Sequence, residues 1–167
     1  MSKLIKNGHV VSDEWKTLTL AEGDAPHRVK LPVGPVLVPL SVWQARRAEL
    51  IHREYEHGWP LGIWLAAGES AEAIERDIDD FTVIAVELNK LAEDNSYSTA
   101  RLLRERYAYK GELRATGDVS RRELSRLQQA GFDAFAVPAG KSIWAALSDL
   151  FNFRSEVNPG QQLAAAV

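Results

Sequence analysis

The chain has 167 residues, of which 46% are hydrophobic and 26% charged, proportions that favour one globular domain able to bury a substantial core. The formal net charge of −3 argues against a nucleic-acid-binding surface, and the lack of cysteine excludes disulfides, thiolate nucleophiles and cysteine-ligated metal clusters. No apolar run approaches the ~20 residues that span a bilayer, and the first residues lack the apolar segment of a signal peptide. We therefore expect one cytoplasmic domain over residues 1–167, with no nucleic-acid or membrane partner.

Residues 1–35 differ in composition from the rest, and we expect them to form a hairpin followed by a loop. Leu4-Ile5 and His9–Val11 are short apolar segments separated by Asn7-Gly8, a pair that suits a two-residue type I′ turn. Glycine, proline and charged residues then prevail between residues 21 and 35, as is typical of a connecting loop. We expect this N-terminal part to cover one edge of a sheet.

After residue 35, short apolar segments alternate with segments of helical spacing. The apolar segments contain β-branched and aromatic residues and predict strands within residues 36–38, 61–65, 81–88, 113–119 and 132–137. The helical segments are expected to begin near Ser41, Ser70, Ser98, Ser120 and Lys141. Gly131 suits the position that ends the fourth of these helices.

This alternation predicts an α/β fold with about five parallel strands joined by right-handed helical crossovers. The spacing does not set the strand order, so a half-barrel-like sheet and a doubly wound sheet both fit. Residues 152–167 contain Asn158-Pro159-Gly160 and an alanine-rich end, and they are expected to form an extended tail.

Charged residues within the third and fourth predicted strands form the first candidate site. Alternation places Glu112, Arg114 and Thr116 on one face of the fourth strand, and Glu87 near the end of the third. Ligands of parallel α/β sheets bind beyond the carboxyl ends of the strands, where Glu87 and Arg114 would meet. Two interpretations stay open. The charged residues either form a polar surface that binds an anionic ligand, or they have a structural role, as an ion pair or as the solvent-exposed face of an edge strand.

The segment after the third strand holds the second candidate site. Arg101 and Arg104 lie three residues apart on one face of the helix expected to begin at Ser98. Near a helix N-terminus, Arg101 would reach a bound anion, whereas the alternative is a solvated basic stripe. Asp118 would either orient Arg114 or cap the next helix, and capping is the favoured role.

Familiar catalytic and cofactor motifs are absent from the sequence. No glycine-rich dinucleotide motif, P-loop or nucleophile elbow occurs, and the four histidines do not have the spacing of metal ligands. We therefore expect no metal site and no cofactor bound by this chain.

Several stretches of the sequence resemble a bacterial family of unknown function. The most specific block covers residues 97–107 (YSTARLLRERY), 111–119 (GELRATGDV) and 131–135 (GFDAF). The opening is similar too, in residues 4–8, 13–15 and 36–40. Members of this family are commonly labelled as oxidoreductases involved in sulfite reduction, because their genes lie beside that of assimilatory sulfite reductase.

By this resemblance, the positions that match the family motif are Tyr97, Ser98, Arg101, Arg104, Arg106, Gly111, Glu112, Arg114, Gly117 and Asp118. The family pattern usually places Asp-Gly-Arg before the Tyr-Ser pair, whereas this chain has Glu93-Asp94-Asn95-Ser96 there. Ala130 stands where the family usually has a cysteine.

The resemblance implies a link to assimilatory sulfite reduction, with sulfite reductase or its electron donor as the partner. Because cofactors carry out such redox chemistry and no cofactor motif occurs here, the first hypothesis is an accessory or small-anion-binding protein without a redox cofactor of its own. Its ligand-binding candidates are Glu87, Tyr97, Ser98, Arg101, Arg104, Arg114 and Asp118. The second hypothesis is an enzyme in which Glu87 acts as a base and Arg114 and Arg101 hold an anionic substrate.

Overall fold

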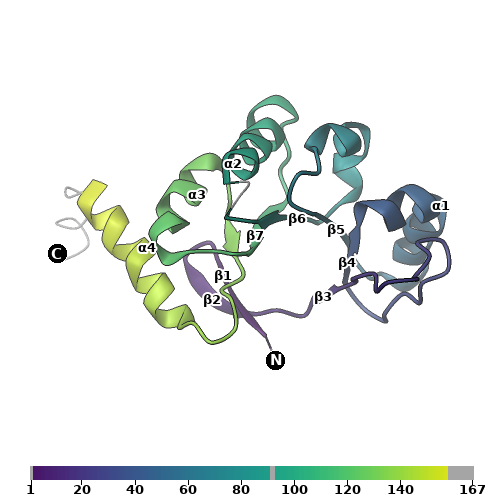
Figure 1. Cartoon of the computed structure of the whole chain (residues 1–167), viewed down its shortest axis with the longest axis horizontal. Helices are drawn as coiled ribbons and strands as arrows, with labels where there is room; N and C mark the ends of the chain where they lie inside the picture. The colour runs from purple at the N-terminus through teal and green to yellow at the C-terminus, as the bar shows by residue number, and fades with distance from the viewer. Residues whose placement is uncertain (1, 91–92, 158–167) are drawn as a thin grey trace.

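The computed structural model describes residues 2–90 and 93–157, and these residues form one eight-stranded sheet with helices packed on its outer face (Figure 1). The strand order is β2-β1-β8-β7-β6-β5-β4-β3. The strands are β1 (Lys3–Lys6), β2 (His9–Ser12), β3 (Lys16–Thr17), β4 (Val36–Pro39), β5 (Leu61–Leu65), β6 (Val83–Leu88), β7 (Glu112–Gly117) and β8 (Ala134–Phe135).

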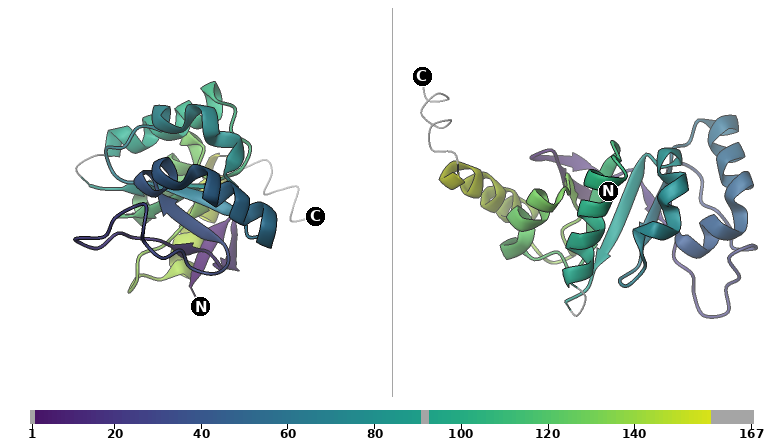
Figure 2. Two further views of the ribbon diagram at one scale, coloured as in Figure 1. Left: turned by 90° about the vertical axis from the view of Figure 1, so that its right-hand side faces the viewer. Right: turned by 90° about the horizontal axis from the view of Figure 1, so that it is seen from above.

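The sheet is a curled half-barrel, which decides between the two arrangements that the sequence left open. Strands β3 to β8 run parallel and follow one another in chain order, without the reversal of order that defines a doubly wound sheet. Because every right-handed crossover then turns the same way, the connecting helices all lie on one face (Figures 1 and 2). The predicted α/β class is confirmed, although the sheet is mixed because β1 and β2 are antiparallel.

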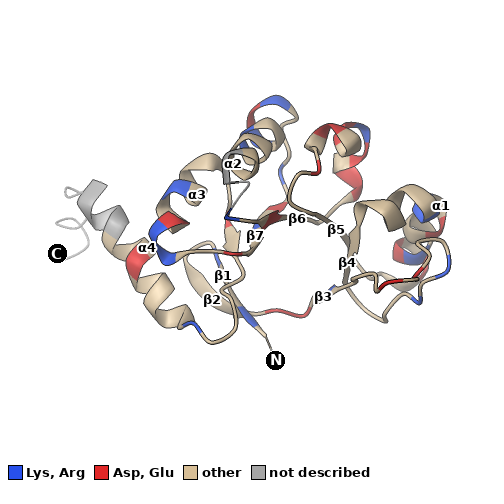
Figure 3. Cartoon of the chain, in the orientation of Figure 1, with Lys and Arg blue, Asp and Glu red and all other residues tan. Residues whose placement is uncertain are grey.

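The helical segments follow the strands along the chain. They are α1 (Leu40–His57), the 3₁₀ helix η1 (Ala71–Asp80), α2 (Glu93–Arg101), the π-helical turn η2 (Leu102–Arg106), the 3₁₀ turn η3 (Arg121–Glu123), α3 (Leu124–Ala130) and α4 (Ile143–Val157). Most of their charged residues are exposed, and Figure 3 shows their positions along the ribbon. No helix among the described residues is long and apolar enough to cross a membrane.

Of the five predicted helix starts, two are confirmed, two are wrong, and the one at Lys141 is two residues early, because α4 begins at Ile143. Ser70 and Ser120 cap η1 and η3, and each side-chain oxygen accepts a hydrogen bond from the backbone two residues later. Ser41 and Ser98 lie inside helices, because α1 begins directly after Pro39 and α2 begins at Glu93. In α1 the buried positions Leu40, Val42 and Trp43 require helical geometry from the end of the strand onward, so packing overrides the capping pattern.

The N-terminal hairpin is confirmed and covers a sheet edge. Asn7 and Gly8 have φ angles of 51° and 79°, as a type I′ turn requires, and β1 pairs with β8. The chain then crosses the inner face of the half-barrel and joins β4 on the opposite edge as β3 (Figure 1). We call residues 13–19 the strap. Its strand, β3, is not among the predicted strands, because this part was expected to hold only a hairpin and a loop.

The C-terminal tail prediction is wrong for residues 152–157, which continue α4. No proline follows Ile143 until Pro159, so nothing in the sequence forbids helix over this stretch. The rest of the predicted tail, residues 158–167, lies outside the described residues.

The sheet has a large hydrophobic core outside and a small apolar cluster inside. Alternate residues of β4 to β8 pack outward against the helices. The inner cluster consists of Leu37, Val83 and Ala85, with Trp15 of the strap and Trp64 of β5 packed against it. The strap therefore covers apolar surface that an open half-barrel leaves in water.

Gly62 lets the strap and β4 approach β5 closely, so we expect Gly62→Ala to destabilise the fold. A Cβ atom there would lie 2.5 Å from Leu37 Cδ2 and 2.8 Å from the Val83 carbonyl oxygen. Because overpacking of this kind typically costs about 1–3 kcal/mol, we expect the free energy of unfolding to fall by that amount. Urea denaturation measures this change. Gly140→Ala is the control, since it meets no atom within 4 Å and costs only its unfavourable φ of +83°. A smaller loss for Gly62→Ala than for Gly140→Ala would contradict the close approach.

Candidate functional site

A cavity of about 230 Å³ lies on the inner face at the carboxyl ends of the parallel strands, where ligands of such sheets bind. We call it the mouth cavity. The strap forms one wall and strands β4 to β7 form the other. Its lining residues are Thr17, Thr19, Leu37, Trp64, Ala85, Glu87, Thr116 and Gly117.

Strand register places the polar lining of the mouth cavity. Glu87 of β6 is half-buried and directly beside Thr116 of β7, so their side chains share the inner face. The Thr116 hydroxyl lies 3.4 Å from the Val86 carbonyl oxygen, to which it donates. Trp64 donates its indole N–H to the carbonyl oxygen of Leu18 at 2.9 Å, which fixes the ring against the strap.

The charge of the mouth cavity comes from Glu87. Among the lining residues that the structure describes, it is the one ionisable side chain. The remaining lining consists of threonine hydroxyls, the Trp64 indole, the apolar Leu37 and Ala85, and a glycine. The cavity therefore combines one carboxylate with an apolar floor, an arrangement that favours small molecules bearing a hydrogen-bond donor.

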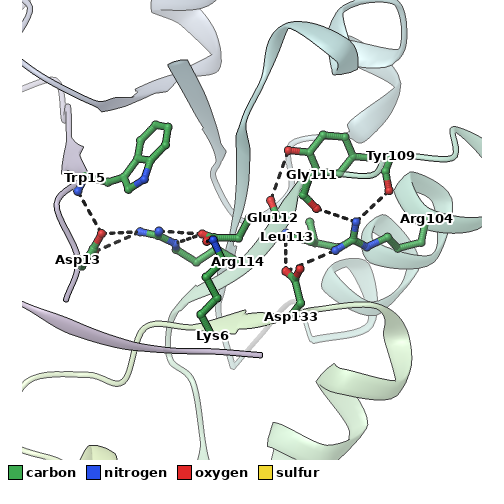
Figure 4. Close-up of polar contacts among 10 residues, drawn as sticks. All are labelled: Lys6, Asp13, Trp15, Arg104, Tyr109, Gly111, Glu112, Leu113, Arg114 and Asp133. Atoms are coloured by element: carbon green, nitrogen blue, oxygen red, sulfur yellow. Dashed lines mark hydrogen bonds and ion pairs between the residues drawn. The ribbon is translucent and has the colours of Figure 1, made fainter. Parts of the chain in front are cut away.

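Arg114 lies on the same inner face as Glu87 but takes other partners (Figure 4). Its guanidinium contacts Glu112 Oε2 at 2.7 and 2.8 Å, and its Nη1 lies 3.1 and 3.2 Å from the Asp13 carboxylate oxygens. Lys6 Nζ contacts the other Glu112 oxygen at 2.9 Å. We call Lys6, Asp13, Glu112 and Arg114 the four-charge cluster.

The four-charge cluster has a structural role. Arg114 and Glu112 side chains are only 3% and 5% exposed, and a buried charge is tolerated when it is paired and hydrogen-bonded. Two cations and two carboxylates balance, so Arg114 has no spare charge for an anion. Its ion pairs among the described residues are with Asp13 and Glu112, not with Glu87. The edge-strand alternative is wrong, because β7 lies between β6 and β8.

Arg104 holds together the loops at the amino end of β7 (Figure 4). Its guanidinium donates to the carbonyl oxygens of Gly131, Tyr109 and Gly111 at 2.8–2.9 Å, and its Nη2 lies 3.4 Å from Asp133 Oδ1. Because the mouth cavity lies at the other end of the strands, Arg104 does not contribute to it.

The surroundings of Arg104 are buried and hydrogen-bonded. Asp133 Oδ1 accepts from the Leu113 backbone N–H at 2.8 Å, and burial raises the pKa of this carboxyl. Burial also raises the pKa of the Tyr109 phenol, which donates to the Phe81 carbonyl oxygen at 2.9 Å. The wide turn η2, closed by the Tyr107 N–H to Leu102 carbonyl bond of 3.0 Å, sets the position of Arg104.

The other predicted site residues lie away from Glu87. Ser98 and Arg101 are exposed on α2, and Arg101 is the last residue of that helix rather than part of its first turn. Tyr97 is half-buried, with the Arg126 guanidinium 5.4 Å from its ring centre. Asp118 is exposed after β7, and Ser120 provides the cap there.

Sequence reasoning missed the strap side of the cavity and the place of Trp64 in its lining. Thr17 and Thr19 carry no sequence signal, since a short polar segment gives no hint of its path across a sheet. Trp64 packs against the inner apolar cluster, and its place in β5 also brings it to the lining of the cavity. Among the described residues, no group of three or more His, Asp or Glu side chains is placed to hold a metal ion.

Removing Arg114 should release the strap. Arg114→Ala leaves Glu112 and Asp13 without their shared partner, and breaking a buried pair in this way costs about 3–5 kcal/mol in unfolding free energy. Asp13→Asn should keep the fold with a smaller loss but free the strap from the sheet, so that trypsin cleaves faster after the exposed Lys16, as limited proteolysis measures. The exposed Arg122→Ala is the control. Unchanged stability of Arg114→Ala would show that the four-charge cluster does not hold the strap.

Arg104 and Arg101 provide a matched pair, because they lie three residues apart in one continuous helical segment. Arg104→Gln removes a guanidinium that serves three carbonyl groups, so thermal unfolding should reveal a loss of about 2–3 kcal/mol. Arg101→Gln changes an exposed side chain and should stay within about 0.5 kcal/mol of the unsubstituted protein. Equal losses for the two substitutions would refute the structural role of Arg104.

Comparison with known proteins identifies the family. No curated protein matches the chain. A family model described as "Bacterial protein of unknown function (DUF934)" matches residues 62–164, more than half of the chain. The match begins in β5 and includes Glu87, Arg104 and Arg114, whereas the strap lies outside it. The chain therefore belongs to this DUF934 family.

Proposed function

We propose that this chain binds a small molecule in the mouth cavity and acts as an accessory protein of assimilatory sulfite reduction, without a redox cofactor of its own. The observation that carries the binding role is Glu87, a half-buried carboxylate in a cavity at the carboxyl edge of a parallel sheet. The link to sulfite reduction rests on the sequence resemblance described above, and it implies docking on sulfite reductase or its electron donor.

The geometry supports ligand binding at Glu87 better than at the arginines. An arginine can bind an anion by charge-assisted hydrogen bonds only when its guanidinium faces the ligand. The guanidinium of Arg114 is balanced by two carboxylates, and that of Arg104 is engaged by backbone carbonyls. Arg101 lies on α2, outside the cavity lining.

The second candidate function is an enzyme in which Glu87 is the base. The observation that favours it is the place of this carboxylate, which lines a cavity with room for a small substrate. In that case Arg114 acts by fixing β7, because its guanidinium is committed to Asp13 and Glu112.

Growth on defined sulfur sources tests the proposed function in a host that encodes this chain. The Glu87→Gln allele should slow growth on sulfate or sulfite and leave growth on sulfide normal, because sulfide bypasses sulfite reduction. Glu105→Gln, which changes an exposed carboxylate on η2, is the matched control and should grow normally on all three. Immunoblots must show equal protein levels for both alleles.

Co-purification tests the accessory role separately. A tagged chain should retain sulfite reductase or its electron donor from cells grown on sulfate. Normal growth of both a deletion strain and the Glu87→Gln strain on sulfate, with neither partner retained, would exclude the proposed function.

A further inference from the structure

We infer that the ligand of the mouth cavity carries a positive charge and is a small organic ammonium ion. This inference rests on the proposed function, because it names the ligand class of the same site.

The charge balance of the inner face favours a cation. Glu87 contributes one negative charge to the cavity lining. The same face of the sheet also carries the four-charge cluster, whose two cations and two carboxylates cancel. Because Leu37 and Ala85 form an apolar floor, the field of the carboxylate is screened less than in water.

The Trp64 ring provides a second group that attracts a cation. Its N–H is occupied by the Leu18 carbonyl oxygen, so the indole contributes its π system rather than a donor to the cavity. A cation within about 6 Å of an indole face gains roughly 0.5–2 kcal/mol. A carboxylate and an indole on neighbouring strands β6 and β5 therefore line one cavity, and both favour ammonium over an anion.

The remaining polar groups suit an ammonium ion that also bears a hydroxyl. Thr17, Thr19 and Thr116 bring hydroxyl oxygens to the lining, and each such oxygen has lone pairs that accept N–H or O–H donors. The cavity volume of about 230 Å³ is below the usual range for drug-sized ligands, so the ligand has few heavy atoms.

Calorimetric titration with matched probes tests the charge preference. Ethanolamine and tetramethylammonium are the cationic probes, ethylene glycol and tert-butanol are their neutral counterparts, and sulfite and sulfate are the anions. We expect the cations to bind and Glu87→Gln to weaken them about tenfold or more, while Glu105→Gln leaves their affinity unchanged. Two-dimensional amide NMR should show that the cations shift the signals of Thr116, Gly117 and the Trp64 indole N–H. The indole signal is assigned as the one that is missing in Trp64→Phe.

Three outcomes overturn the inference. They are equal affinity for the cationic and neutral probes, preferential binding of sulfite or sulfate with shifts at the same signals, and cation binding that Glu87→Gln leaves unchanged. The growth experiment separates this failure from that of the proposed function. A growth defect of Glu87→Gln together with preferential anion binding refutes the charge class alone. Cation binding at the cavity supports the charge class, and if the deletion and Glu87→Gln strains then grow normally and neither partner is retained, the link to sulfite reduction is refuted.

Discussion

The buried contact between Arg114 and its two carboxylates holds the N-terminal segment across the half-barrel. Asp13 comes from the strap and Glu112 from β7, so one guanidinium joins parts of the chain 101 residues apart. With the strap in place, Trp15 covers the inner apolar cluster and Thr17 and Thr19 reach the mouth cavity. Without it, the inner face of the sheet would be open to water and the cavity would lose one wall.

Four positions of the motif by which the sequence resembles its family have a structural role. Arg104 clamps the loops before β7, and Glu112 and Arg114 hold the strap. Gly117 ends β7 with φ of +78°, where a Cβ atom would lie 2.6 Å from the Leu88 carbonyl oxygen, and it also lines the cavity. The carboxylate that supports a binding role, Glu87, precedes this motif on the neighbouring strand.

The mouth cavity is built from two parts of the chain with different relations to the family. Trp64, Ala85, Glu87, Thr116 and Gly117 lie within the matched segment, whereas Leu37 and the two strap threonines lie before it. The carboxylate and the indole are thus part of the matched framework, and the strap adds a wall of hydroxyl groups. Changes at Thr17 and Thr19 would alter the cavity wall without disturbing the sheet, because these two side chains line the cavity and take no part in the outer core.

The sequence by itself determined the features that depend on neighbouring residues. Asn7-Gly8 specifies the hairpin turn, Ser70 and Ser120 cap their helices, and period-two alternation puts Glu112, Arg114 and Thr116 on one face of β7, because each signal acts within a few residues. Only the tertiary structure decided the strand order, the partners of Arg104 and Arg114, and the cavity wall. The partners of Arg114 and the cavity wall depend on where the strap crosses the sheet, and the partners of Arg104 depend on the wide turn η2. Long-range packing sets these features and the strand order, and no local pattern encodes them.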